Sequence, residues 1–192
     1  MAKDHSRGFT LIELMVTLAI LSILAMVAAP NFGDIKRNSE LTSIANNYLA
    51  ALNTARFEGM KRNTNALIVP TNGDTNWGQG WMIFVDMDMN NKYNAGDILI
   101  QKFDAPPNYI GVTPSSGGTA AESPLSYILY DGSGFAKTSS GGFGANTVQF
   151  ARTDVASTQY NQIRRVKISP SGRVRICTPT SDADSTCSAV RD

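Results

Sequence analysis

The sequence has almost no histidine: the one residue of this type among 192 is His5. It lies within residues 1–8, a short polar leader that precedes the first apolar run. A chain that loses this leader contains no histidine, which excludes a Ser-His-Asp or Cys-His mechanism and a zinc site with histidine ligands. No pattern of Ser, Asp and Lys converges on a general base. We therefore predict that the protein is not an enzyme, has no catalytic residue and needs no cofactor or metal.

The sequence also lacks an excess of either charge, with 17 Lys and Arg against 16 Asp and Glu. The leader holds Lys3, Arg7 and Asp4, so its removal leaves 15 cations and 15 anions. A neutral chain has no global field that attracts a polyanion. Any binding to DNA must therefore come from a local basic patch.

Cysteine is scarce as well. Cys177 and Cys187 are ten residues apart near the C-terminus, among Pro, Ser and Asp residues. This spacing predicts one disulfide that closes a loop of about eleven residues, worth roughly 2.5–3 kcal/mol on the chain-entropy model, and an oxidising compartment. The alternative is two free thiols in a cytosolic chain, against which the apolar N-terminus argues because it indicates export.

The long apolar run covers residues 9–29 and contains a single charged residue, Glu13. A helix of this length crosses a bilayer core of about 30 Å. The run is too long for the apolar region of an ordinary signal peptide and has no A-x-A site followed by a polar start. A carboxylate in a spanning helix costs up to about 3 kcal/mol. Glu13 therefore needs a partner, and a free amine on Phe9 or on a neighbouring subunit is a natural one.

The segment RGFTLIELMVTLAILSILAMVAAP resembles the class III signal of type IV pilins and pseudopilins. The resemblance implies that a prepilin peptidase cuts between Gly8 and Phe9 and methylates the new Phe9 amine. It implies that Glu13 pairs with the N-terminus of a neighbouring pilin during assembly. It also implies a single-pass protein of the inner membrane with a periplasmic head, which later joins a pilus filament at the cell surface.

A helical pattern continues past Pro30, which should bend or locally open the helix. Apolar residues recur every three to four positions at Leu41, Ile44, Tyr48, Leu52 and Ala55, which predicts an amphipathic helix that ends near residues 62–64. We expect an α+β fold of the type IV pilin kind, with one long N-terminal helix packed on a β-rich head. The predicted parts are a leader (1–8), a transmembrane and filament-core helix (9–30), an amphipathic helix half (31–64) and a head with a C-terminal disulfide loop (65–192).

The head is predicted from short apolar stretches between turn signals, consistent with 16 Gly and 8 Pro residues in the chain. The predicted strands are 66–70, 81–86, 97–103, 126–130, 147–151, 164–169 and 173–177. Residues 113–123 and 132–146 are expected to be connectors.

Residues 86–97 place oxygen-bearing side chains at the spacing of an EF-hand loop. However, Asn91 replaces the glycine of that loop, Asp97 replaces its bidentate Glu, and the flanking residues indicate strands. A hairpin connection rich in Asp and Asn explains the segment without calcium.

Residues 163–177 carry five cations and no acid. The cations are Arg164, Arg165, Lys167, Arg173 and Arg175. Pro170-Ser171-Gly172 is a good three-residue hairpin loop, and it places Lys167 opposite Arg175. In this register the apolar residues share one face, and Arg165, Lys167, Arg173 and Arg175 share the other.

Like charges opposite each other destabilise a sheet, so this face gains by binding an anion such as DNA through its phosphates. The alternative is a solvated edge, or ion pairs with Asp154, Asp182 or Asp184. The sequence Ser-Gly-Arg-Val-Arg-Ile-Cys resembles the Gly-Arg-x-Arg motif of FimT-like minor pilins, which serve DNA uptake in naturally competent bacteria. That resemblance implies that Arg173 and Arg175 contact DNA, with Arg164, Arg165 and Lys167 as supporting charge.

FimU-like minor pilins, which help to start pilus assembly, share a similar C-terminal pattern. The resemblance to proteins of the GspH/FimT type covers most of the chain. It implies a minor pilin of a type IV pilus that captures DNA for natural transformation, or, as the alternative, a pseudopilin of type II secretion without DNA binding.

Overall fold

The computed structural model describes residues 8–117, 125–138 and 140–189, except for the side chains of residues 27–31. Residues 1–7 of the predicted leader, with His5, lie outside this description. The chain comprises two compact units, residues 1–39 and residues 40–192.

Helix α1 (Leu11–Arg62) has recognisable signals at both ends. At its start, the Glu13 N–H donates to Thr10 Oγ1 at 3.3 Å and the Thr10 N–H donates to Glu13 Oε2 at 3.2 Å, which is a capping box. At its end, Asn63 is left-handed with φ 51°. The Thr64 N–H then donates to the Gly59 carbonyl at 3.1 Å and the Asn63 N–H to the Met60 carbonyl at 3.3 Å, which is a Schellman motif. The helix therefore ends where the Asn-Thr-Asn sequence predicts.

The backbone of α1 is helical through Pro30. Of the two predicted effects of this proline, a bend or a local opening, the local opening is therefore not present. The loss of one hydrogen-bond donor is tolerated because the neighbouring turns keep their own hydrogen bonds.

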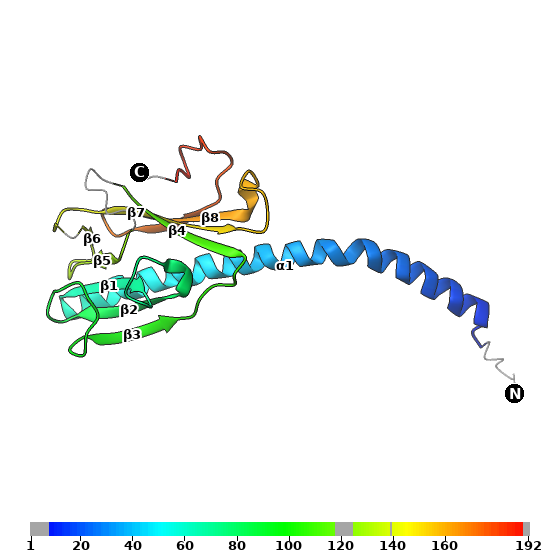
Figure 1. Cartoon of the computed structure of the whole chain (residues 1–192), viewed down its shortest axis with the longest axis horizontal. Helices are drawn as coiled ribbons and strands as arrows, with labels where there is room; N and C mark the ends of the chain where they lie inside the picture. The colour runs from blue at the N-terminus through cyan, green and yellow to red at the C-terminus, as the bar shows by residue number, and fades with distance from the viewer. Residues whose placement is uncertain (1–7, 118–124, 139, 190–192) are drawn as a thin grey trace, which may run out of the picture. The chain divides into compact units, whose positions relative to one another are not determined.

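The second unit holds two antiparallel sheets (Figure 1). The first has the order β3-β2-β1-β5-β6, and the second has the order β4-β7-β8-β9. The strands of the first sheet are β1 (Asn65–Pro70), β2 (Trp81–Asp86), β3 (Ile98–Phe103), β5 (Ile128–Tyr130) and β6 (Ala136–Lys137). The strands of the second sheet are β4 (Ile110–Gly117), β7 (Ala145–Arg152), β8 (Ile163–Ile168) and β9 (Val174–Cys177). Two short 3-10 helices lie at Trp77–Gln79 and Tyr160–Gln162.

Seven of these strands correspond to predicted ones, with ends that differ by at most two residues. Strand β6 lies within the predicted connector 132–146, and β4 overlaps the predicted connector 113–123 over residues 113–117, so the connector prediction was wrong there. β4 contains Pro114, pairs with β7 and comes first in the order of its sheet. A strand at a sheet edge tolerates a proline, because its missing N–H faces away from the sheet.

The core lies where α1 meets the inner faces of both sheets. Four of the five predicted apolar positions of the helix are buried and Ile44 is partly buried, which confirms the amphipathic pattern. The Tyr48 ring contacts Trp77, Trp81 and Phe150, with ring centroids 5.0–6.0 Å apart. The helix therefore joins the two sheets into one core.

Candidate functional site

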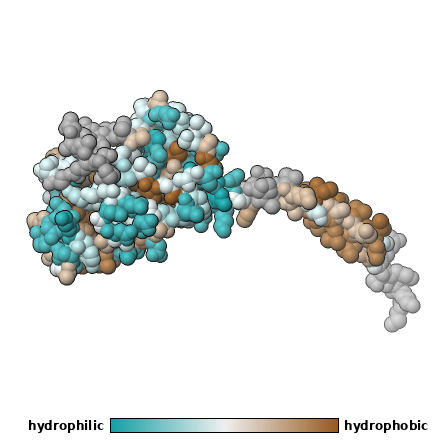
Figure 2. Space-filling model, in the orientation of Figure 1, coloured by the Kyte–Doolittle hydropathy of each residue, from teal (hydrophilic) through white to brown (hydrophobic). Residues whose placement is uncertain are grey.

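The first part of α1 presents an apolar surface. Every large apolar side chain from Phe9 to Met26 is at least 50% exposed, and Phe9 is 81% exposed. Figure 2 shows the resulting apolar surface along these turns. Among the residues that the structure describes, no helix combines the length and the apolar character that crossing a membrane requires.

Glu13 is the one charged residue of this apolar stretch. Its Oε2 accepts hydrogen bonds from the Thr10 N–H and the Thr10 hydroxyl, each at 3.2 Å. In this chain, which retains residues 1–8, the nitrogen of Phe9 belongs to a peptide bond with Gly8 and is not an amine. The carboxylate is therefore held at the start of the helix by its own turn. Gly8 and Phe9, on either side of the predicted cleavage bond, are both exposed.

The C-terminal hairpin of β8 and β9 has the predicted register. Lys167 lies opposite Arg175 and Ile168 opposite Val174. The Gly172 N–H donates to the Ser169 carbonyl at 2.9 Å, and Gly172 has φ 78°. Glycine is required at this turn for a second reason, since a Cβ atom would lie 2.1 Å from the Gly134 carbonyl oxygen.

The two cations on the outer face of β8 are buried by the end of the chain. Arg165 is 4% exposed and Lys167 is 3% exposed. Arg165 donates from Nε to Gln149 Oε1 at 2.8 Å and from Nη1 to the Cys187 carbonyl at 2.6 Å. Lys167 Nζ donates to Ser188 Oγ at 3.0 Å. The structure thus gives both side chains internal partners.

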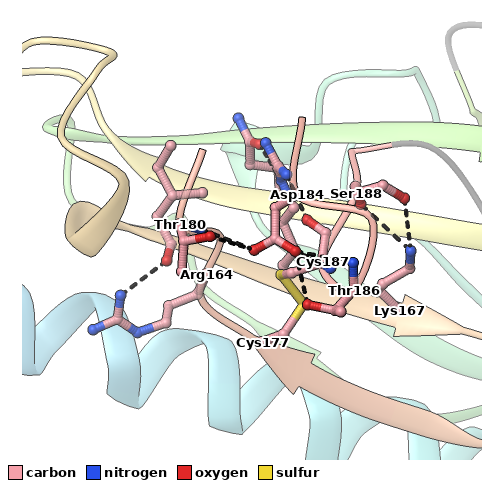
Figure 3. Close-up of a disulfide and its surroundings, with 11 residues drawn as sticks. Arg164, Lys167, Cys177, Thr180, Asp184, Thr186, Cys187 and Ser188 are labelled. Carbon is pink, nitrogen blue, oxygen red and sulfur yellow. Dashed lines mark hydrogen bonds between the residues drawn. A yellow bond between two sulfur atoms is a disulfide. The ribbon is translucent and has the colours of Figure 1, made fainter. Parts of the chain in front are cut away.

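The partners belong to a segment that we call the C-terminal cover, residues 178–189. The predicted disulfide between Cys177 and Cys187 is present and ties this segment to β9 (Figure 3). At its far end, Ser115 Oγ of β4 donates to the Ala189 carbonyl at 2.6 Å. The cover therefore contacts β9, β8 and β4 in turn, on the outer face of the second sheet.

Asp184 organises the C-terminal cover (Figure 3). Its carboxylate accepts hydrogen bonds from the Thr186 hydroxyl at 2.7 Å, the Thr180 N–H at 2.9 Å and the Cys187 N–H at 3.1 Å. The hydrogen bonds from Thr186 and Thr180 hold the pKa of Asp184 well below its usual range, because they stabilise the ionised form. Asp184 thus holds the disulfide loop in its folded conformation through these hydrogen bonds.

Arg164 faces the opposite side of β8, because side chains alternate along a strand. Its Nε donates to the Thr42 hydroxyl of α1 at 3.2 Å, and burial lowers its pKa. Of the alternative acidic partners, Asp154 forms an ion pair with Arg152 at 2.8 Å. Of the five predicted DNA-contacting cations, Arg173 is exposed and Arg175 is half-buried. The structure does not bring Arg164, Arg165 and Lys167 into one accessible basic surface with them.

Two other cations lie at the hairpin loop, and no sequence pattern pointed to them. Arg56 of α1 donates from Nη2 to the Ser171 carbonyl at 3.1 Å. Lys137 of β6 is half-buried and lies 3.6 Å from the Asp131 carboxylate. The loop reaches this region because the Ala136 N–H donates to the Pro170 carbonyl at 3.1 Å. Contacts between residues more than 30 positions apart leave no local pattern in a sequence.

The loop of residues 86–97 joins β2 to β3 and brings three carboxylates together. Side-chain oxygens of Asp86, Asp88 and Asp97 lie within 4.8 Å of one another. Asp86 is buried, and its pKa is raised mainly because burial disfavours the ionised form. Asp86 accepts from the Asn91 N–H at 2.8 Å, and Asp97 accepts from the Met87 N–H at 2.9 Å. The three carboxylate oxygens could hold a cation. Backbone N–H groups already satisfy Asp86 and Asp97 without a metal. That the loop binds no calcium stays a prediction.

The comparisons with known proteins agree with this geometry. Residues 45–172 match the family described as type II transport protein GspH, and residues 3–29 match the prokaryotic N-terminal methylation motif. A crystal structure of the type IV minor pilin FimU of Pseudomonas aeruginosa has a TM-score of 0.54 at 19% identity, and the match covers 74% of this chain and 95% of that one. This likeness shows a shared fold.

Two curated relatives match a shorter stretch. The type IV major alpha-pilin of Moraxella bovis is 41% identical over 59 residues, and the type IV major pilin protein PilA of Myxococcus xanthus is 49% identical over 54 residues. These matches cover 29% and 28% of this chain, and 37% and 24% of the two relatives. The chain thus spans well under half of the length of these relatives.

Proposed function

Because the chain belongs to the GspH family of pilins and pseudopilins and carries an N-terminal methylation motif, we propose that it is a minor pilin of a type IV pilus. The subunit waits in the inner membrane as a single-pass protein with its head in the periplasm. It then joins other pilins in a filament. A pseudopilin of type II secretion remains the alternative within the same family.

The observation that carries this proposal is the exposed apolar surface of residues 9–26. Burial of apolar surface contributes about 25 cal/mol per Å², and soluble monomers rarely expose contiguous patches above a few hundred Å². Lipid covers this surface before assembly, and the same helical segment of neighbouring subunits covers it in the filament.

Cleavage between Gly8 and Phe9 creates the amine that Glu13 needs. In the uncleaved chain, Thr10 is the partner of the Glu13 carboxylate among the residues that the structure describes. A charged amine is a stronger donor than the neutral Thr10 groups. In the filament, Glu13 therefore pairs with the N-terminus of a neighbouring subunit, and the carboxylate selects processed subunits for assembly.

A Glu13→Leu variant tests the proposed assembly step in the native host. The amount of subunit in sheared filaments should fall at least about tenfold, since one lost buried charge pair corresponds to several kcal/mol, while the membrane fraction keeps the protein. Thr17→Val is the matched control, because it replaces another polar residue of the same exposed stretch. Normal incorporation of Glu13→Leu would contradict the proposed pairing.

A second function, DNA capture, is supported by the hairpin loop. Arg173 is exposed beside this loop, and the Arg56 guanidinium donates to the loop itself. Together with Arg175 these cations can contact the phosphates of DNA without reading its sequence. Arg165 and Lys167 take no part in this contact, since they hold the C-terminal cover.

Binding of duplex DNA by the full-length chain in nanodiscs of zwitterionic lipid tests this second function. Affinity should fall with salt, with a slope near 0.9 per phosphate contacted, and Arg173→Gln/Arg175→Gln should reduce that slope by about 2. Lys92→Gln is the control, since Lys92 is an exposed cation of another loop. An absence of binding by the unchanged chain would leave a filament subunit or a secretion pseudopilin without a DNA role.

A further inference from the structure

Two phenylalanine rings lie exposed at the surface of the head. Phe135 lies between β5 and β6, and Phe143 lies shortly before β7. The rings are 5.4 Å apart between centroids in an edge-to-face arrangement. Phe135 is 39% exposed and Phe143 is 62% exposed. Rings this exposed contribute little to the core and are available to a partner.

The aromatic pair is adjacent to the hairpin loop. The Ala136 N–H, next to Phe135, donates to the Pro170 carbonyl at 3.1 Å. The carbonyl oxygen of Gly134, on the other side of Phe135, lies so close to Gly172 that a Cβ there would clash. Phe135 is therefore flanked on both sides by residues that contact the loop.

One cation contacts the pair directly, and two more belong to the neighbouring hairpin loop or contact it. The Lys137 ammonium lies 4.0 Å from the centroid of the Phe143 ring. The Arg56 guanidinium donates to the Ser171 carbonyl, and its Nε is buried without a hydrogen-bond partner in the described part of the chain. Arg173, which follows the loop, is exposed. The aromatic pair and the three cations thus all lie on or beside the residues that contact the hairpin loop.

We propose that Phe135 and Phe143, with Arg56, Lys137 and Arg173, form a binding platform for single-stranded nucleic acid. The bases stack on the exposed Phe143 ring, and the cations contact the phosphates on either side. The proposal rests on the proposed DNA contact of the hairpin and adds a preference for strands whose bases are unpaired.

The preference follows from which faces of a base are accessible. In a duplex, each base is stacked between its neighbours, so a protein ring finds no free face. In a single strand, every base offers a face to an aromatic ring, and such stacking is largely independent of sequence. Phosphate contacts alone bind both forms, whereas phosphate contacts with an aromatic platform favour the single strand.

The surroundings of the pair also favour an anionic strand over a neighbouring pilin as the occupant. An apolar contact between subunits does not need three cations around it. A phosphate chain is attracted by such cations, although Lys137 also lies 3.6 Å from the Asp131 carboxylate.

The test compares the binding of single-stranded and duplex DNA, and the unchanged chain with variants of Phe143. Full-length chain in nanodiscs of phosphatidylcholine is titrated into labelled oligothymidine of about 20 nucleotides, longer than the site of one small binding fold, and into a duplex of equal length. The single strand should bind more tightly. Phe143→Ser should weaken single-strand binding by about tenfold and leave duplex binding unchanged, while Phe143→Trp should retain it. Arg173→Gln should weaken both ligands.

Leu99→Ser provides the matched control, because Leu99 is an exposed apolar residue on β3. It should change neither affinity. Equal binding of both ligands with no effect of Phe143→Ser would overturn the platform and leave the phosphate contacts of the hairpin intact. No binding of either ligand would overturn the DNA role and the platform together. If Phe143→Ser leaves single-strand binding unchanged but lowers the amount of subunit in sheared filaments, the platform is overturned in favour of a contact between subunits.

Discussion

The two ends of the chain reverse the usual relation between polarity and burial. In residues 9–26 the apolar side chains are exposed. On β8, two of the cations are almost fully buried and hydrogen-bonded to the chain itself. An exposed apolar surface requires a partner outside the molecule, whereas a buried charge requires one inside it.

The comparison separates residues that act outward from residues that hold the fold. Glu13 and the apolar stretch around it are exposed, as the proposed contacts with lipid and with other subunits require. Arg165 and Lys167 are instead buried and donate hydrogen bonds to the C-terminal cover. Within the hairpin, Arg173 is exposed and belongs with the residues that act outward. Four predictions test the division, beginning with the largest expected effect.

Blocking the predicted cleavage site should abolish removal of residues 1–8 completely. Gly8→Val places a branched side chain beside the predicted cleavage bond, where a small residue is expected. The purified protein should keep the mass of residues 1–8. Gly33→Val is the control, since Gly33 is also an exposed glycine with open space around it. A normal mature mass for Gly8→Val would contradict the assignment of the cleavage site.

Removing the disulfide should produce the largest loss of stability at the C-terminal end. Cys177→Ser/Cys187→Ser should lower the free energy of unfolding by about 2.5–3 kcal/mol, because the unfolded chain is no longer closed into a loop. Equilibrium unfolding in urea measures this change. A reducing agent should have the same effect on the unchanged protein and no effect on the variant. Equal stability with and without the disulfide would show that the cover is not held by it.

Neighbouring cations of the hairpin should differ in what their loss affects. Arg165→Met should lower the free energy of unfolding by about 2 kcal/mol, because the Cys187 carbonyl and the Gln149 side chain lose a buried donor. Arg173→Gln, at an exposed position, should change it by less than about 0.5 kcal/mol. Urea unfolding of the two variants side by side decides the point. Similar losses for both would show that the structural division between them is wrong.

The smallest expected effect is a pH dependence of the C-terminal cover. Folding lowers the pKa of Asp184, so the folded state binds a proton less readily than the unfolded state, whose pKa is about 3.9. The stabilisation is therefore complete above about pH 5 and declines as the pH falls below about 4. Unfolding midpoints of the unchanged chain and Asp184→Asn should differ at pH 7 and approach each other at pH 3. A constant difference across this range would rule out the ionised carboxylate as its source.

Local chemistry allowed much of the fold to be predicted. The spacing of Leu41, Tyr48 and Leu52 identified the buried face of α1, and Pro170-Ser171-Gly172 identified the register of the hairpin. Strand β4 was missed because Pro114 and its Ser, Thr and Gly neighbours carry no apolar alternation. Its place in the sheet comes from pairing with β7, far along the chain.

Local sequence is enough to specify which side chains of β8 and β9 share a face, because that depends on a two-residue period and on one turn. It also determined the apolar N-terminal stretch and the disulfide pair. Which of those faces is covered follows from long-range packing. Arg165 and Lys167 are buried by Cys187 and Ser188, more than 20 residues further on. Burial depends on which distant segment packs on a surface, and a local sequence pattern carries no record of that segment.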